Sequence, residues 1–368
     1  MKSMPSFCKN ENDNFHFKQL KKLVYEEVKN LGTKRLRWVK LKTFLFPLLY
    51  IAAYVIALQQ KEHVFLFYTC FVLMGMFMVM IYLNIIHDAG HNAIFKAKKT
   101  NESLLLLLDL LGANSYIWKI KHVQLHHDFP NVAGWDSDVQ QHGLIKFFPS
   151  DKTKKIHKYQ HITIFFLYPL FFLNWLLIRD FKDYFLATQP VKKIHSIPLK
   201  EYVKLFLFKL VFIFYIIFLP ILFFGFTFSQ TTLALMFMLV TAAIIALAGL
   251  LTQHVNIKND FPVVQQNGSL ETTWFIMQLV TVNNVHTTNW VTRVLLGNFN
   301  YHLAHHLFPH ISYAYAKEVT AIISAYSKQN DLPYRSFSFS NALKYHYLLV
   351  KKNGIQKDSL KSIYEVKM

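Results

Sequence analysis

Residues 64–91 read VFLFYTCFVLMGMFMVMIYLNIIHDAGH. The part from 64 to 86 carries no charged residue and is long enough for a bilayer-spanning helix, which takes about 20 apolar residues. It runs directly into His87-Asp88-Ala89-Gly90-His91, in which two histidines stand four residues apart. Residues at that spacing lie on one face of a helix. A membrane-spanning helix that ends in paired imidazoles is the feature from which the rest of the fold can be predicted.

Further apolar runs lie on both sides of this stretch. Residues 43–58 precede it by five residues, and residues 205–226 and 232–251 form another pair with an equally short connection. Each pair predicts a helical hairpin across the membrane. Two weaker segments, 104–111 and 162–178, are interpreted differently. The first is too short to cross a bilayer, and the second contains Pro169 and Asn174 and is predicted to be an interfacial helix.

Composition agrees with a membrane protein. Hydrophobic residues make up 53% of the 368 residues and charged residues only 17%, against about 25% in an average soluble protein. The formal charge of +19 is concentrated beside apolar runs, with eleven lysines and arginines in residues 1–42. This distribution is the positive-inside pattern and places the N-terminus in the cytosol. No basic stretch contains a nucleic-acid reading motif, so a nucleic-acid partner is not expected.

Two more histidine motifs follow the first. One is His122-Val123-Gln124-Leu125-His126-His127, and the other is His302-Leu303-Ala304-His305-His306. With four spans, all three motifs lie on the cytosolic side. If 162–178 also crossed, the third motif would lie across the membrane from the other two.

These eight histidines exceed what one first-row metal ion accepts. Neutral imidazole suits iron, copper and zinc, and zinc usually stops at three or four ligands. The pattern therefore favours two metal ions, and many nitrogen ligands with open positions suit iron and dioxygen. Cys8 and Cys70 are too far apart in the sequence for a cysteine metal site. The remaining isolated histidines are interpreted as solvated or structural: His16, His63, His142, His157, His161, His195, His310 and His346.

The three motifs resemble the histidine boxes of the membrane fatty acid desaturase superfamily. The path from Asp109 to His127 and the spacing of Asn131, Gly134, Asp136 and Asp138 are similar to the bacterial linoleoyl-CoA desaturase-like, or front-end, group. So is the third box, which is followed by Leu307-Phe308-Pro309. The chain departs from that group in opening this box with His302 instead of Gln and in carrying Asp128-Phe129-Pro130 after the second box. These changes concern the substrate more than the metal ligands.

The resemblance implies a ninth ligand after the fourth span. His254 lies there, and His286 is the alternative. Metal-bound histidines usually donate their second N–H to a carboxylate or carbonyl. Asp88, Asp136 and Asp138 are the expected partners, and helix capping or solvation is the alternative for each. The ligand set that follows from the boxes and the resemblance is His87, His91, His122, His126, His127, His254, His302, His305 and His306.

The fold class is thus an all-α integral membrane protein with four spans in two hairpins and a cytosolic helical cap that holds the di-iron site. Three regions are expected: a cytosolic amphipathic segment at 1–42, a membrane desaturase domain at 43–311 and a cytosolic helical tail at 312–368. The membrane is a bacterial inner membrane or the endoplasmic reticulum.

The resemblance implies an O2-dependent desaturase that introduces a cis double bond into an acyl-CoA or acyl-lipid. Electrons would come from a separate ferredoxin or cytochrome, because 42 residues leave no room for a fused cytochrome-b5-like domain. The alternatives are a di-iron hydroxylase or ketolase on a lipid and, less favoured, a histidine-rich metal transporter. Transporters place polar groups near the middle of their spans, whereas these histidines lie at span ends.

Overall fold

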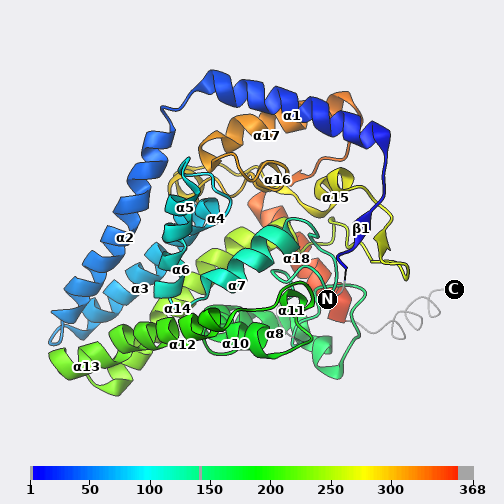
Figure 1. Ribbon diagram of the computed structural model, residues 1–368. Coiled ribbons are helices and arrows are strands. Elements are labelled where there is room, and N and C mark those ends of the chain that lie inside the picture. The colour runs from blue at the N-terminus through cyan, green and yellow to red at the C-terminus, as the bar shows by residue number, and fades with distance from the viewer. Residues whose placement is uncertain (1–2, 141–142, 355–368) are drawn as a thin grey trace.

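Long apolar helices extend away from a helical cap in the computed structural model, which describes residues 3–140 and 143–354 (Figure 1). Five described helical segments are long and apolar enough to cross a membrane. Four of them overlap the predicted spans, with the span predicted at 205–226 ending at Phe224, and the fifth contains the segment 162–178 that was predicted to be interfacial. The five are Leu36–Leu58, Val64–Gly90, Lys155–Ile194, Leu199–Phe224 and Phe228–Gln253.

The helices α2 (Leu36–Leu58), α3 (Val64–Ile81) and α14 (Phe228–Leu250) pack along one another. Gly75 permits a close approach between α3 and α14, since a Cβ at this position would collide with the backbone carbonyl of Met238. α14 begins with a capping box, in which Thr227 accepts a hydrogen bond from the Gln230 amide. This packing fixes the ends of α3 and α14, from which the first histidine box and His254 continue.

The second half of the membrane region is less regular. α12 (Leu199–Ile213) continues through the π-helix η6 (Phe214–Phe218) into α13 (Leu219–Phe224). The fifth apolar segment is a chain of short pieces, interrupted by a 3₁₀ turn at Tyr168–Leu170 that contains Pro169. Its pieces are η3 (Lys155–Tyr159), α8 (Gln160–Leu167), η4 (Tyr168–Leu170), α9 (Phe171–Asn174), η5 (Trp175–Arg179), α10 (Asp180–Phe185) and α11 (Pro190–Ile194).

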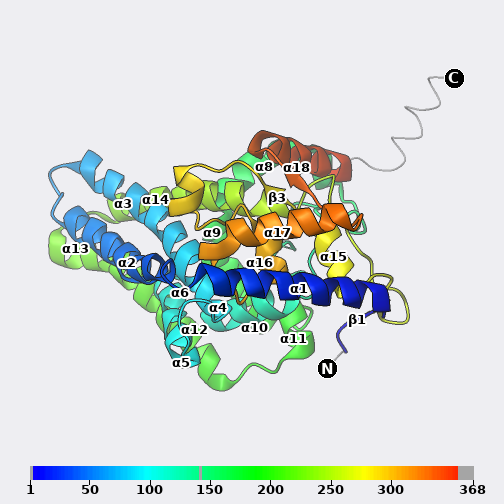
Figure 2. The same ribbon diagram turned by 90° about the horizontal axis from the view of Figure 1, so that it is seen from above.

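The cap is built from both ends of the chain. The amphipathic helix predicted near the N-terminus is α1 (Glu11–Leu31), which lies along α17 (Ala316–Gln329) in both views (Figures 1 and 2). Leu20 and Val24 of α1 share an apolar cluster with α15 (Trp274–Thr281), α16 (His302–Leu307) and α17. The C-terminal helix α18 (Phe339–Gly354) packs against α8. The last part of the predicted tail, 355–368, lies outside the described residues, as does His142.

The prediction of a mainly helical protein is confirmed. The described residues also contain two short parallel strand pairs, β1 (Ser6–Phe7) with β2 (Ser269–Leu270) and β3 (Asn284–Val285) with β4 (Ser336–Phe337). The remaining elements are α4 (His87–Gly90), α5 (Lys98–Leu104), α6 (Leu106–Leu110), α7 (Ser115–Lys119), the π-helices η1 (Tyr82–Ile86), η2 (Ile120–His126) and η8 (Val291–Leu295), and the 3₁₀ turns η7 (Leu251–Gln253) and η9 (Tyr313–Tyr315).

Candidate metal centre

Four separate parts of the chain bring their histidines to one place. α3 continues through the π-helix η1 into α4, which carries His87, and the second box lies on the π-helix η2. His254 follows α14 and η7, and the third box forms α16. π-Helical turns are frequent at functional sites because they re-aim side chains within a helix. The nine predicted ligands all lie in this cluster and are buried or half-buried.

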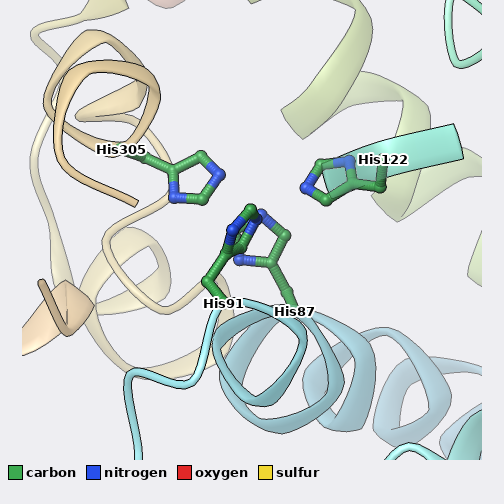
Figure 3. A group of neighbouring side chains, drawn as sticks. All are labelled: His87, His91, His122 and His305. Carbon is green, nitrogen blue, oxygen red and sulfur yellow. The ribbon is translucent and has the colours of Figure 1, made fainter. Parts of the chain in front are cut away.

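The cluster contains two groups of four imidazoles. Within each group, one nitrogen atom of every ring lies within 4.8 Å of those of the others. Figure 3 shows the first group, with rings from α4, η2 and α16 directed toward a shared space. The groups are His87, His91, His122 and His305, and His126, His254, His302 and His306.

His127 lies between the two groups. Its ring centroid is 4.4 Å from that of His91 in one group and 4.4 Å from that of His306 in the other. Its Nε2 atom is 2.9 Å from Nε2 of His305. The geometry therefore places His127 in reach of both groups and assigns it to neither.

Helical spacing predicts that the histidines of one box lie on one face, but only the first box keeps its two rings, His87 and His91, in one group. The second box divides between the groups, with His122 in one and His126 in the other. The third box divides in the same way, with His305 in the first group and His302 and His306 in the second. In the π-helix η2 the His127 amide donates a hydrogen bond to the carbonyl of His122, five residues back.

The predicted carboxylate partners contact these rings. Asp138 Oδ2 lies 2.8 Å from Nδ1 of His122, and Asp136 Oδ1 lies 2.9 Å from Nδ1 of His126. Asp88 is a weaker partner, 3.4 Å from Nδ1 of His87, and it also accepts a hydrogen bond from the Tyr313 amide. A carboxylate at Nδ1 holds the proton there and leaves Nε2 free of it.

Several buried imidazole nitrogen atoms in the cluster make no hydrogen bond to the part of the chain that the structure describes. Nε2 of His87, His122 and His306 is buried without a hydrogen-bond partner among the described residues, although Nδ1 of each ring has one. Buried polar atoms are normally satisfied, so each exception needs an explanation. A metal ion in each group would satisfy these atoms, and the donor set therefore fits two ions that bind imidazole.

The electrostatics favour the neutral, ligand form of most of the rings. Burial lowers the pKa of His122 to about 4, although the Asp138 carboxylate opposes that shift. Burial and neighbouring histidines also hold the pKa of His91, His302 and His305 well below its usual value. His126 differs: burial lowers its pKa, but the charge and hydrogen bond of Asp136 and the charge of Asp138 together outweigh burial and raise the pKa.

The two candidates for the ninth ligand lie in different surroundings. His254 is buried, and its Nε2 is 2.6 Å from Nε2 of His302. Two ligands at right angles on one ion, each about 2.1 Å from it, would lie about 3 Å apart, so this distance is of the expected order. His286 is exposed, and its Nδ1 lies 3.5 Å from the hydroxyl of Ser336. The structure brings His254, and not His286, into the cluster.

Several supporting residues were not predicted from the sequence. Gln278 accepts a hydrogen bond from Nδ1 of His306 and donates one to the carbonyl of His127. A buried glutamine in the otherwise apolar helix α15 was the available signal. His310 contacts the carbonyl of His91 through Nδ1, and His346 contacts the carbonyl of Val255 in the same way. These two isolated histidines, predicted to be solvated or structural, support the backbone beside the cluster.

An apolar cavity of about 110 Å³ opens onto the cluster. His122, His126, His254 and His302 form one side of it, so the cavity reaches both groups. Its other walls come mainly from α3, α6, α9, η5 and the end of α14. They include Met78, Leu108, Phe171, Phe172, Trp175 and Leu250. Such a lining suits a hydrocarbon chain and excludes water.

The fold and the cluster together define a membrane protein with a histidine-rich candidate metal site beside an apolar cavity. The sequence profile described as "Fatty acid desaturase" matches residues 63–338. The chain therefore belongs to the fatty acid desaturase family, and membership indicates an oxidoreductase. The profile match confirms the family that the three histidine boxes indicated by resemblance.

Similar proteins carry desaturase names. An acyl-lipid (8-3)-desaturase of Physcomitrium patens is 30% identical over 314 residues, which cover 83% of this chain and 64% of that protein. This chain thus spans less than two thirds of the Physcomitrium protein. An sn-1 linoleoyl-lipid 6-desaturase of Arthrospira platensis is 25% identical over 91% of both chains. A Synechocystis protein of the same name is 25% identical over 74% of this chain and 76% of its own.

Proposed function

We propose that this chain is an O2-dependent acyl desaturase, in which the clustered histidines hold two iron ions and a cis double bond is introduced into a fatty acyl chain. The observation that carries the proposal is the apolar cavity whose wall includes imidazoles of both groups. A hydrocarbon chain in this cavity would lie beside the metal site without contacting water. The names of the family and of its relatives support the same reaction.

In this proposal His87, His91, His122 and His305 hold one ion, and His126, His254, His302 and His306 hold the other. His127 would complete one of the two ligand sets. Bound iron would supply dioxygen-dependent oxidation, which an unactivated methylene requires because it has no acidic proton for a general base to remove.

Residues around the cluster orient the imidazole rings and position the acyl chain. Asp136 and Asp138 keep a proton on Nδ1 of His126 and His122, so that Nε2 can bind metal. Phe171 and Trp175 line the cavity and would fix which carbon atoms of the acyl chain lie beside the histidines.

We also propose that only four of the five apolar segments cross the membrane. Charged residues near the end of the fifth segment are buried against η2 and against α12. Asp183 pairs with Lys121 at 2.6 Å, and Asp180 pairs with Lys209 at 2.7 Å. At its other end, Gln160 bonds the backbone of Lys146 and Val350. Both ends therefore contact cap elements, which favours a segment that enters and leaves on one side.

With four spans in two hairpins, all three boxes lie on one side, and the basic N-terminal residues favour the cytosol. An electron donor, a separate ferredoxin or cytochrome, would dock on that side. The substrate would be an acyl-CoA or an acyl-lipid.

Gas chromatography–mass spectrometry of the lipids of cells that express this chain tests the proposal. A variant with both His126→Ala and His127→Ala serves as the inactive control. A new unsaturated acyl chain that is absent in the variant would support desaturation and locate the double bond. A hydroxylated product would identify a hydroxylase instead. No product from iron-loaded protein with a working electron donor would refute the proposal.

A further inference from the structure

Two more hollows adjoin the cavity beside the histidine cluster. The first, which we call the basic pocket, has a volume of about 510 Å³ and lies between η2 and α10 and the region around residue 150. Six lysines and Arg179 line it, against two carboxylates, Asp151 and Asp183. The excess of positive charge suits an anionic group that carries more than one negative oxygen, such as a phosphate.

The second hollow, which we call the apolar groove, has a volume of about 570 Å³. One wall is the broken helix around Leu170, Leu173 and Leu177, and the other is the end of α14. Leu170 and Leu177 are 40% and 55% exposed. Exposed leucines on an apolar segment of a membrane protein indicate a surface that faces lipid.

Shared residues connect the three spaces in order. Lys154 and Lys182 line both the basic pocket and the groove. Phe171, Leu247 and Leu251 line both the groove and the cavity beside the histidines. A basic pocket, an apolar groove and a metal-facing cavity thus follow one another, which matches the charged head and long tail of a phospholipid.

We propose that the substrate is a phosphate-bearing membrane lipid that enters sideways from the bilayer. Its phosphate binds in the basic pocket at Lys154 and Lys182, and one acyl chain passes through the groove into the cavity between Phe171 and Leu247. This inference rests on the proposed desaturase function and specifies the carrier of the acyl chain. A soluble acyl-CoA also carries phosphate, but it would not need an apolar groove that opens toward lipid.

The test uses the full-length protein in lipid nanodiscs and two photoreactive probes with identical diazirine-bearing acyl chains. One probe is a phosphatidylcholine, and the other is the corresponding uncharged diacylglycerol. Cross-linked peptides are mapped by mass spectrometry. We expect the phosphatidylcholine probe to label the cavity, and Lys154→Gln with Lys182→Gln to reduce that labelling about tenfold, because two charge-assisted contacts are lost. Labelling by diacylglycerol should not change.

Two further variants control the experiment. Lys18→Gln with Lys22→Gln removes the same charge from the exposed face of α1 and should leave labelling intact. Leu170→Trp fills the groove at a residue that does not line the cavity and should reduce labelling by the phosphatidylcholine probe from the bilayer. Equal labelling by both probes, unaffected by the lysine variant, would overturn the proposal.

A photoreactive acyl-CoA separates the two sources of phosphate. If acyl-CoA labels the cavity more strongly than phosphatidylcholine, and Leu170→Trp does not reduce this labelling, entry from the bilayer is refuted. If the lipid labels as expected but iron-loaded, reduced enzyme forms no double bond, the lipid site stands and the desaturase function fails. If a product forms and neither the lysine variant nor Leu170→Trp reduces its amount, the desaturase function stands and the proposed lipid site fails.

Discussion

Asp136 Oδ1 lies 2.9 Å from Nδ1 of His126, and both side chains are buried. The other carboxylate oxygen accepts a hydrogen bond from the Asn131 amide, so the carboxylate is held in place while it orients the ring. We expect Asp136→Asn to lower iron affinity about 10- to 100-fold, because the ring loses the charge that fixes its tautomer. Titration with a competing chelator measures this loss.

Asp260→Asn is the matched control for Asp136→Asn. The Asp260 side chain is largely exposed, and its carboxylate pairs with Arg335 and not with a histidine ring. Its substitution should leave iron affinity at the parent value. Parent-like affinity in Asp136→Asn would show that the carboxylate does not tune the ligand.

His254 and His286 offer a second matched pair. His254 is buried within a group of four imidazoles, whereas His286 is exposed. We expect His254→Ala to bind about one iron per chain and to lose activity, because one ion loses a ligand and water fills its place. His286→Ala should keep two irons. Iron per chain is measured by inductively coupled plasma mass spectrometry. Full occupancy in His254→Ala would remove it from the ligand set.

Local sequence patterns were enough to predict the long apolar helices and the three histidine boxes, and the family resemblance added His254. The uncharged run 64–86 specifies a helix through its apolar composition, and the spacing of each box limits where its rings can point. How the boxes divide between the two groups was not predictable. The third box divides although it lies on the regular helix α16, so the division depends on how α16 meets η2, which tertiary packing sets.

The supporting residues were harder to predict for a similar reason. Gln278 lies 24 residues before His302 in an apolar helix, and His346 lies in a helix far from any box. Their hydrogen bonds to the cluster and to the backbone beside it arise only when distant segments pack together. By contrast, Asp136 and Asp138 follow the second box closely, and short connections confine them to its neighbourhood.

The proposed topology predicts which residues react from each side of the membrane. In a Cys8→Ser, Cys70→Ser background, Lys152→Cys and Lys200→Cys flank the fifth apolar segment. Both should react with a membrane-impermeant maleimide from the cytosolic side, because the segment enters and leaves on that side. Gln60→Cys, between α2 and α3, should react only from the opposite side. Labelling of the two flanking positions from opposite sides would show that the fifth segment crosses.

Metal removal should destabilise the protein as well as inactivate it. Without metal, Nε2 atoms of rings such as His87 and His306 are buried and unsatisfied. An unsatisfied buried polar group costs about 1–3 kcal/mol, and a ligand that binds only the folded state stabilises it by mass action. We expect chelation to lower the thermal midpoint by about 5–10 °C, as measured by dye-based unfolding in detergent.

Iron should restore both the midpoint and the activity. Zinc should restore the midpoint alone, because it can bind imidazole but has no redox chemistry. An unchanged midpoint on chelation would mean that the cluster is stable without metal, and activity with zinc alone would rule out redox chemistry at this site.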